Sequence, residues 1–548
     1  MDRLAYRRNG GELKPDDTSV LKLSVFNRGD FAVFGVLSVL QLFLIFEVYA
    51  EWFGARDLQA GPFVFWMLTA LLTVRILVRL TQWSALPRMR RPGRRAARPG
   101  WKVGIATTFV PGLESLEMLE QTVRAIVSID YPHDTWVLDE GDSDEVREMC
   151  RRLGALHFSR KGQARFQTPG GVFASRTKYG NYNAWFHAVG FERYEIVAGF
   201  DPDHVPDSAF LEASLGYFDD QRVGYVQLPQ TYYNQAASLI ARGAAEETYS
   251  YYSSTQMAAN GGGWPLVTGC HNLHRVEALR EIGGFAPHDA DDMLITYLYR
   301  ENDWSGVYVP EIRAWGLTPV NWSGYLSQQL RWSRSVLDIK FRVLPRIRTG
   351  LALFDRCLSA VHGLSYLKGL MALVGTLLLI VMLALGRFPF GNIGRPVGMI
   401  LLLLFVFYAA DLYRQRFFLD VRREWGLHWR AGILQYAKWP FLALAVVDVV
   451  LRRRTSYTTT LKVAGGARRL VLFWPHAAIV LALVGAWAVG VLNGVQHHPS
   501  VLVWGASMAV ASLLLIVSEF FEYPPPYERE LWDTRFPAGA GYSQRGRR

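Results

Sequence analysis

One short segment near the end of the long polar region combines side chains that bind phosphates and sugars. It reads Gln328-Gln329-Leu330-Arg331-Trp332, a Q-x-x-R-W pattern. An arginine guanidinium can bind two phosphate oxygens at once, an indole offers a flat face to a sugar ring, and a glutamine amide both donates to and accepts from hydroxyls. The pattern suits a nucleotide-sugar site. It equally suits an ordinary amphipathic helix at a membrane surface, so the rest of the chain must decide.

Acidic residues recur at the ends of apolar segments. Asp201 and Asp203 form a D-x-D pattern, and two such carboxylates suit Mg²⁺ or Mn²⁺ shared with diphosphate oxygens. An acidic turn would give the same pattern. Asp139 begins a second acidic cluster, D-E-G, and Lys178 begins a K-x-G-N turn in which its ammonium can face phosphate. That turn is also an ordinary helix start.

A further acidic pair, Asp291-Asp292, begins a segment with helical character. A carboxylate near a metal-bound diphosphate can act as the general base that deprotonates an acceptor hydroxyl. The alternative is that the pair only stabilises a helix N-terminus.

Strands and helices alternate in the region that contains these residues. Helical spacing covers Leu113–Val127, and short apolar runs predict strands at Val103–Phe109, Trp136–Asp139 and Glu195–Phe200. This alternation favours a mainly parallel α/β sheet. Ligands bind such sheets beyond the carboxyl ends of the strands, which is where Asp139 and Asp201 fall.

The composition is that of a membrane protein. Half of the residues are hydrophobic, 18 are tryptophan, and the formal charge of +11 comes from basic residues that flank apolar segments. This placement favours lipid headgroups over nucleic acid as the partner of the basic residues. The three cysteines, Cys150, Cys270 and Cys357, are too far apart for a metal or disulfide pattern, which fits a reducing, cytosol-facing domain.

Six apolar runs are long enough to span a bilayer: Phe31–Phe53, Gly61–Trp83, Ser365–Gly386, Gly398–Leu412, Leu470–Leu492 and Val501–Phe521. Arginine-rich linkers at 88–98 and 414–430 place those segments, and both termini, in the cytosol. The run 432–451 is interrupted by Lys438, Pro440 and Asp448 and has basic residues on both sides. We therefore expect an interfacial or re-entrant helix there.

The motifs occur in the order D-E-G, K-x-G-N-x-N, D-x-D, T-G-C, D-D, Q-x-x-R-W. In this order, from Val103 to Trp332, the chain resembles the processive family-2 inverting glycosyltransferases, the cellulose, chitin and hyaluronan synthases. Its layout is closest to that of bacterial cellulose synthase-like proteins. The resemblance implies an α/β, GT-A-type (Rossmann-like) cytosolic domain inserted between transmembrane helices, and a UDP-sugar donor.

The resemblance also assigns roles to individual residues. Asp292 becomes the catalytic base, because it lies twelve residues before Trp304, close to the spacing in that family. The remaining roles are nucleotide-sugar binding by Asp139, Lys178, Asp201, Gln328 and Arg331; metal binding by Asp201 and Asp203; acceptor binding by Trp332, Thr268, Gly269 and Cys270; and gating by Thr460 and Lys462.

Three motifs depart from the family pattern. The family's T-Y-N-E is Thr108-Phe109-Val110-Pro111 here, D-D-G is D-E-G, and T-E-D is Ala290-Asp291-Asp292. Each required ionisable position keeps an aspartate, so we expect an active enzyme, although the departures weaken any identity with one named synthase.

The expected organisation follows from these assignments. It comprises a cytosolic N-terminal segment (1–30), two transmembrane helices (31–83), the GT-A domain (84–320), an interfacial helix with Q-x-x-R-W (321–345), two transmembrane helices (358–413), a cytosolic interfacial helix with a gating-loop-like segment (414–468), two transmembrane helices (469–521) and a disordered cytosolic tail (522–548).

The expected function is polymerisation of a UDP-sugar, with UDP-glucose as the first candidate, into a β-linked polysaccharide that crosses the membrane. The expected cofactor is Mg²⁺ or Mn²⁺. The expected partners are the donor, the growing polysaccharide, the lipid bilayer and accessory export proteins, without nucleic acid, and the expected location is a bacterial-type plasma (inner) membrane. Two alternatives stay open: a non-processive transferase that adds one sugar to a lipid or oligosaccharide, and an inactive transport or scaffold protein.

Overall fold

Seven strands form the central sheet of an α/β domain, in the order β13-β10-β12-β8-β5-β6-β7. Adjacent strands are parallel except β12, which runs antiparallel to both β8 and β10. The strands are β5 (Val103–Phe109), β6 (Asp134–Asp139), β7 (Leu156–Phe158), β8 (Ile196–Phe200), β10 (Val223–Gln227), β12 (Asn272–Arg275) and β13 (Ser305–Tyr308). The predicted mainly parallel α/β sheet is confirmed.

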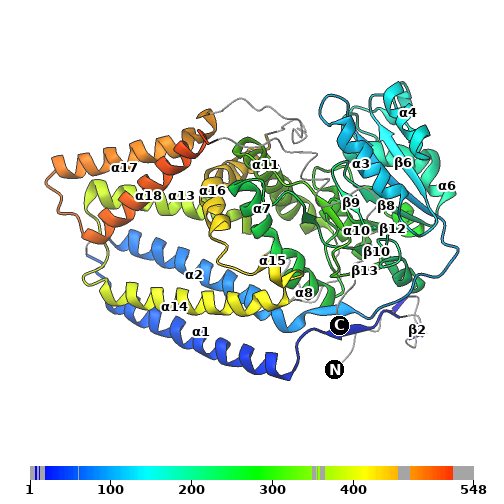
Figure 1. The fold of residues 1–548 in the computed structure, drawn as a ribbon. Coiled ribbons are helices and arrows are strands. Elements are labelled where there is room, and N and C mark those ends of the chain that lie inside the picture. The colour runs from blue at the N-terminus through cyan, green and yellow to red at the C-terminus, as the bar shows by residue number, and fades with distance from the viewer. Residues whose placement is uncertain are drawn as a thin grey trace.

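This computed structural model describes residues 7–8, 11–12, 19–59, 61–347, 353, 356–357, 365–453 and 470–521. Figure 1 shows the α/β domain beside a bundle of long helices. The gating residues Thr460 and Lys462 and the tail after Phe521 lie outside the described residues, so the predictions made for them stay predictions.

Helices cover both faces of the sheet, because its central strands are apolar on both sides and must be shielded from water. The helix predicted at Leu113–Val127 is α3 (Leu116–Val127), which begins after the cap residue Ser115. The other helices of the domain are α4 (Asp144–Leu153), α5 (Lys178–Trp185), α6 (Phe191–Arg193), α7 (Leu239–Ser250), α8 (Gln256–Gly261), α9 (Val276–Glu281) and α10 (Asp291–Glu301).

Small strands complete the domain and join it to the N-terminal segment. β3 (Lys22–Ser24) pairs antiparallel with β4 (Arg90–Pro92), so the arginine-rich linker packs against the start of the chain. A second small sheet contains β9 (Val205–Pro206), β11 (Thr231–Tyr232) and β14 (Ala314–Gly316).

Seven helices in the described part of the chain are long and apolar enough to cross a membrane. Six of them match the six predicted spans: α1 (Arg28–Gly54), α2 (Pro62–Ser84), α13 (Lys368–Leu385), α14 (Gly394–Arg414), α17 (Trp474–Leu492) and α18 (Pro499–Ser518). The seventh is α16 (Trp429–Val450), whose apolar window is 50% buried inside the protein, against 17–33% for the others. Its interfacial position stays a prediction.

The polar residues that interrupt α16 contact the α/β domain. Lys438 Nζ donates to Glu247 Oε2 of α7 and to Gln329 Oε1 of α11 (Trp322–Asp338), each at 2.9 Å. Asp448 binds the guanidinium of Arg334, also in α11. Figure 1 places α16 next to α7 and α11. The charges in this apolar helix therefore attach the bundle to the domain.

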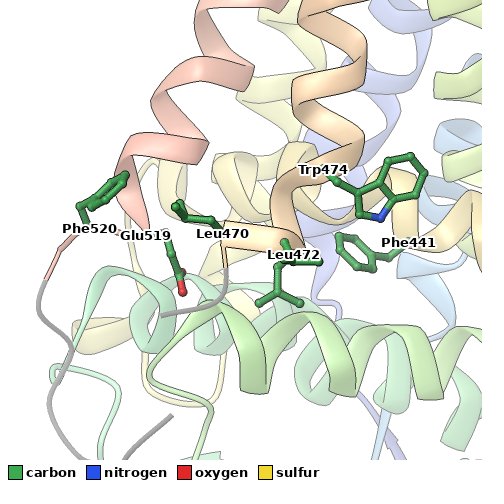
Figure 2. Close-up of a pocket in the computed structure, with 7 residues that line it drawn as sticks. Phe441, Leu470, Leu472, Trp474, Glu519 and Phe520 are labelled. Carbon is green, nitrogen blue, oxygen red and sulfur yellow. The ribbon is translucent and has the colours of Figure 1, made fainter. Parts of the chain in front are cut away.

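A pocket of about 610 Å³ opens where α16, α17 and α18 meet. Figure 2 shows its lining, which is apolar apart from one carboxylate: Phe441, Leu470, Val471, Leu472, Trp474, Glu519 and Phe520. None of the predicted site residues that the structure describes lines this pocket.

Candidate functional site

Lys178 brings three of the sequence motifs together. Its Nζ donates to Asp201 Oδ1 at 2.5 Å and to the carbonyl oxygen of Gly269 at 2.7 Å. Thr177 caps the start of α5 by accepting from the Gly180 N–H, and a Cβ at Gly180 would lie 2.2 Å from the Ala174 carbonyl oxygen. Any residue larger than Gly180 would therefore clash with the backbone at this position.

The charge of Lys178 is stabilised by its neighbours. Burial alone would lower the pKa of Lys178, but the adjacent Asp201 carboxylate raises it well above its usual value. The ammonium is therefore protonated at neutral pH and can face a phosphate group.

Asp201 and Asp203 lie in the turn that follows β8, as predicted. The turn is held by a hydrogen bond from His204 N to the Asp201 carbonyl and by one from Thr122 Oγ1 to the Pro202 carbonyl. The donor atoms of Asp201, Asp203 and His204 lie within 4.8 Å of one another. Two carboxylates at this spacing fit Mg²⁺ or Mn²⁺, which prefer oxygen ligands.

Asp139 ends β6 with its carboxylate fully buried. Oδ1 accepts from Gly141 N at 2.7 Å, Oδ2 accepts from Ser143 N at 2.6 Å, and His157 Nε2 lies 3.3 Å from Oδ2. Burial raises the pKa of Asp139, but these hydrogen bonds, that of His157 first, outweigh burial and hold it below its usual value. In this conformation Asp139 shapes the D-E-G loop, and its nucleotide-binding role stays a prediction.

Asp291 and Asp292 form the first turn of α10, directly opposite the T-G-C segment. A Cβ built on Gly269 would lie 3.8 Å from Asp292 Oδ2, while Asp292 Oδ1 accepts from Met293 N at 2.7 Å. Burial raises the pKa of both carboxyls, and repulsion from Asp292 helps to raise that of Asp291 to about 7. A carboxylate with a raised pKa is a stronger base, as proton abstraction requires.

The T-G-C segment is fixed from beneath by Gln227. Its amide accepts from Thr268 N at 2.8 Å and donates to the Cys270 carbonyl at 2.9 Å. Gly269 is exposed on the site side, whereas the Cys270 side chain is only 1% exposed and lies against His204 inside the domain. Gly269 is thus the member of the segment that faces Asp292. Acceptor contact by Thr268 and Cys270 stays a prediction.

The Q-x-x-R-W helix, α11, packs against α16 and α7. Gln328 and Trp332 share a helical face with Val336 and Ile339, and the latter two belong to the same apolar cluster as Met293. Trp332 is 38% exposed. The indole of Trp332 is thus accessible, as stacking against a sugar would require.

Two buried polar contacts of the site have no local sequence signal. Arg160 is fully buried, pairs with Glu140 of the D-E-G loop and donates to the Ala174 carbonyl ahead of Lys178. His157 contacts Asp139 from the neighbouring strand β7. Both connect segments that only the folded sheet brings together.

Comparison with known proteins agrees with this architecture. The model of "Glycosyltransferase like family 2" matches residues 104–335. This part of the chain, less than half of its length, is therefore similar to family-2 glycosyltransferases. The domain has the GT-A fold, with its D-x-D turn at the carboxyl end of β8.

The curated relatives match slightly less than half of this chain. The cellulose synthase catalytic subunit (UDP-forming) of Pseudomonas fluorescens is 28% identical over 276 residues, which cover 48% of this chain and 36% of the relative. The protein of the same description from Xanthomonas axonopodis pv. citri is 28% identical over 258 residues, covering 45% of this chain and 34% of the relative. The chain thus spans about a third of the length of these relatives.

Among solved structures, a mannosyltransferase from Pyrobaculum calidifontis in complex with GDP-Man and Mn²⁺ is 16% identical. It covers 71% of this chain and 99% of its own, with a TM-score of 0.47. Glucosyl-3-phosphoglycerate synthase from Mycobacterium tuberculosis is 15% identical and covers 38% of this chain and 70% of its own, with a TM-score of 0.27.

Proposed function

We propose that this protein is a processive, inverting glycosyltransferase that polymerises a UDP-sugar into a β-linked polysaccharide and passes it across the membrane. The observation that carries the proposal is the position of Asp292. Its Oδ2 faces Gly269, whose carbonyl oxygen accepts from the same Lys178 that binds Asp201. A candidate base therefore lies beside Lys178, which suits a diphosphate, and Asp201, which suits the divalent cation that a diphosphate binds. The descriptions of the relatives favour UDP-glucose as the donor.

In the proposed reaction, Asp292 takes the proton of the acceptor hydroxyl. The acceptor oxygen forms a bond to the anomeric carbon while the bond from that carbon to the UDP oxygen breaks, and attack from the opposite face inverts α to β. Lys178 and Arg331 bind the phosphates through charge-assisted hydrogen bonds. A divalent cation held by Asp201 and Asp203 would supply positive charge opposite the departing diphosphate.

Processivity and export are proposed from the position of α11. This helix carries the exposed Trp332 and contacts α16 of the bundle through Arg334 and Gln329. An acceptor stacked on Trp332 would lie between the site and the apolar helices. We place the domain and both termini in the cytosol, and the chain in the plasma (inner) membrane, because of the arginines at 88–98 and 414–430.

The test uses the purified full-length protein in lipid nanodiscs, supplied with several UDP-sugars and Mg²⁺ or Mn²⁺. We expect UDP release with one donor, a long polymer by gel filtration, and loss of both in EDTA. Digestion of the polymer with linkage-specific hydrolases identifies the bond. Addition of a single sugar would favour the non-processive alternative. An absence of UDP release with every donor would contradict the proposal.

A further inference from the structure

Three side chains with nitrogen or sulfur donor atoms meet beneath the D-x-D turn. His204 follows β8, and Cys270 and His271 precede the adjacent strand β12. His204 Nδ1 lies 2.8 Å from His271 Nε2 and 3.1 Å from Cys270 Sγ. All three side chains are buried, and one donor atom from each lies within 4.8 Å of the others. The glycosyl-transfer reaction proposed above uses none of these three atoms.

The surroundings orient each donor atom toward the same point. His271 Nδ1 is 2.9 Å from the Pro229 carbonyl, which can only accept, so in the neutral ring Nδ1 carries the proton and Nε2 presents its lone pair to the cluster. Gln230 Nε2 donates to Cys270 Sγ at 3.1 Å, while Gln230 Oε1 accepts from Tyr252 Oη at 2.9 Å. Metal-binding histidines and thiolates have outer partners of this kind.

The backbone of His271 also has a conformation that non-glycine residues rarely adopt. Its φ is +57°, in the left-handed region, where the Cβ of a non-glycine residue crowds the backbone. The imidazole of His271 is fully buried and points toward His204. The cluster is therefore built by the fold rather than by chance contact of surface side chains.

We propose that His204, Cys270 and His271 form a second metal site, which takes Zn²⁺ or a similarly soft divalent ion. A thiolate with two imidazoles is a zinc-type ligand set, whereas Mg²⁺ and Mn²⁺ prefer the oxygens of Asp201 and Asp203. Tetrahedral zinc with these ligands keeps the donor atoms about 3.3–3.6 Å apart. The cluster would need to open by about half an ångström, and the fourth position would be left for water.

Binding would move protons as well as the ion. The Cys270 thiol proton leaves to solvent as the zinc–sulfur bond forms, and the ring proton of His204 moves from Nδ1 to Nε2. The Nε2 atom of His204 faces Asp203, whose Oδ2 is 4.0 Å away. Because His204 also belongs to the donor set at the D-x-D turn, zinc would leave Asp201 and Asp203 to hold a hard cation without it.

The test is Co²⁺ and Zn²⁺ binding to the full-length protein in detergent, prepared without a polyhistidine tag. Cys357 is exposed, so Cys357→Ser is the background for every sample. We expect about one tightly bound zinc ion per chain. Co²⁺ should give intense visible absorption of tetrahedral geometry and a sulfur-to-cobalt charge-transfer band. These readouts do not depend on glycosyl transfer.

Variants assign the spectrum to the cluster. Cys270→Ser should abolish the charge-transfer band, and His271→Gln should weaken zinc binding by about 10-fold or more. The matched control is Cys150→Ser, since Cys150 is also buried but lies in α4, and it should keep the full spectrum. If the Cys357→Ser protein shows no sulfur-to-cobalt band, or if Cys270→Ser is folded by gel filtration and retains the band, the proposal is wrong.

Discussion

The ammonium group of Lys178 lies 2.5 Å from Asp201 Oδ1, and it joins the start of α5 to the turn that follows β8. The pair is only partly shielded, with 24% of the lysine and 28% of the aspartate side chain exposed. A diphosphate or a divalent cation that enters the site would therefore meet both charges at once. In the structure each neutralises the other, so ligand binding must rearrange or share this contact.

The first prediction concerns this lysine. Lys178→Gln removes the cation beside Asp201, so UDP affinity, measured by calorimetry, should fall by about 10-fold, which is typical of one charge-assisted hydrogen bond. The control is Lys161→Gln, whose exposed ammonium binds only the Gly141 carbonyl among the hydrogen-bond partners found for it. Equal UDP affinity in Lys178→Gln and the parent protein would remove Lys178 from the phosphate site.

The second prediction concerns the two acids of α10. Asp292→Asn should leave UDP binding intact and reduce transfer by about 10²-fold or more, because the base is lost. Asp291→Asn should keep transfer close to that of the parent protein, because Asp292 remains to accept the proton. If Asp291→Asn loses transfer and Asp292→Asn keeps it, Asp291 is the base.

Stability gives an independent check of the same pair. Burial and Asp292 raise the pKa of Asp291 from 3.8 to about 7. A carboxyl whose pKa is raised by folding stabilises the fold fully below the unfolded pKa, and that contribution is lost as the pH rises through about 7. Asp291→Asn should therefore melt at the same temperature as the parent near pH 4 and at a higher temperature near pH 8. If the melting temperatures of the variant and the parent differ by the same amount at pH 4 and at pH 8, the raised pKa of Asp291 is contradicted.

Parts of this structure follow from local sequence, and others do not. β5 matches its prediction residue for residue, because a strand that is buried on both faces is mainly apolar and carries no charge. The acids at the ends of β6 and β8 are placed by the same argument. The contacts of His204 with Cys270 and His271 were not predicted, since His204 is 66 residues away from Cys270 and only the pairing of β8 with β12 brings it close. The charges of α16 predicted an unusual helix but not their partners on α7 and α11.

The third prediction concerns the contact between α11 and α16. Asp448 is 5% exposed and binds Arg334 through Oδ2. Its other oxygen, Oδ1, lies 3.6 Å from Arg453 Nη1. Arg334→Met leaves this buried carboxylate with the weaker partner and should destabilise the protein by about 3 kcal/mol. Adding Asp448→Asn should recover most of that loss, as thermal unfolding in detergent would measure. Losses that simply add in the double variant would show that the pair is not coupled.

The fourth prediction concerns the topology of α16. Leu427 and Leu451 flank the helix and are exposed, so cysteines can replace them in a Cys357→Ser background. If α16 lies along the membrane surface, both cysteines should resist a membrane-impermeant maleimide in intact cells and react after the cells are opened. Labelling of one but not the other in intact cells would show that α16 crosses the membrane.

The last prediction returns to Trp332, which is 38% exposed on α11. If its indole stacks on the acceptor sugar, Trp332→Ala should lose about 1–2 kcal/mol of acceptor binding, by analogy with aromatic pairs. Mispositioning of the acceptor hydroxyl should lower the rate by about a further 10²-fold. Polymer chains should therefore be short or absent while UDP affinity stays near that of the parent.

Arg331→Ala should instead weaken UDP binding directly, and Arg331→Lys should restore it only in part, because lysine lacks the planar fork. Trp332→Phe, which keeps a stacking face, is the matched control. Long polymer from a well-folded Trp332→Ala protein would end the stacking hypothesis, and loss of folded protein in both alanine variants would indicate that these residues only anchor the helix.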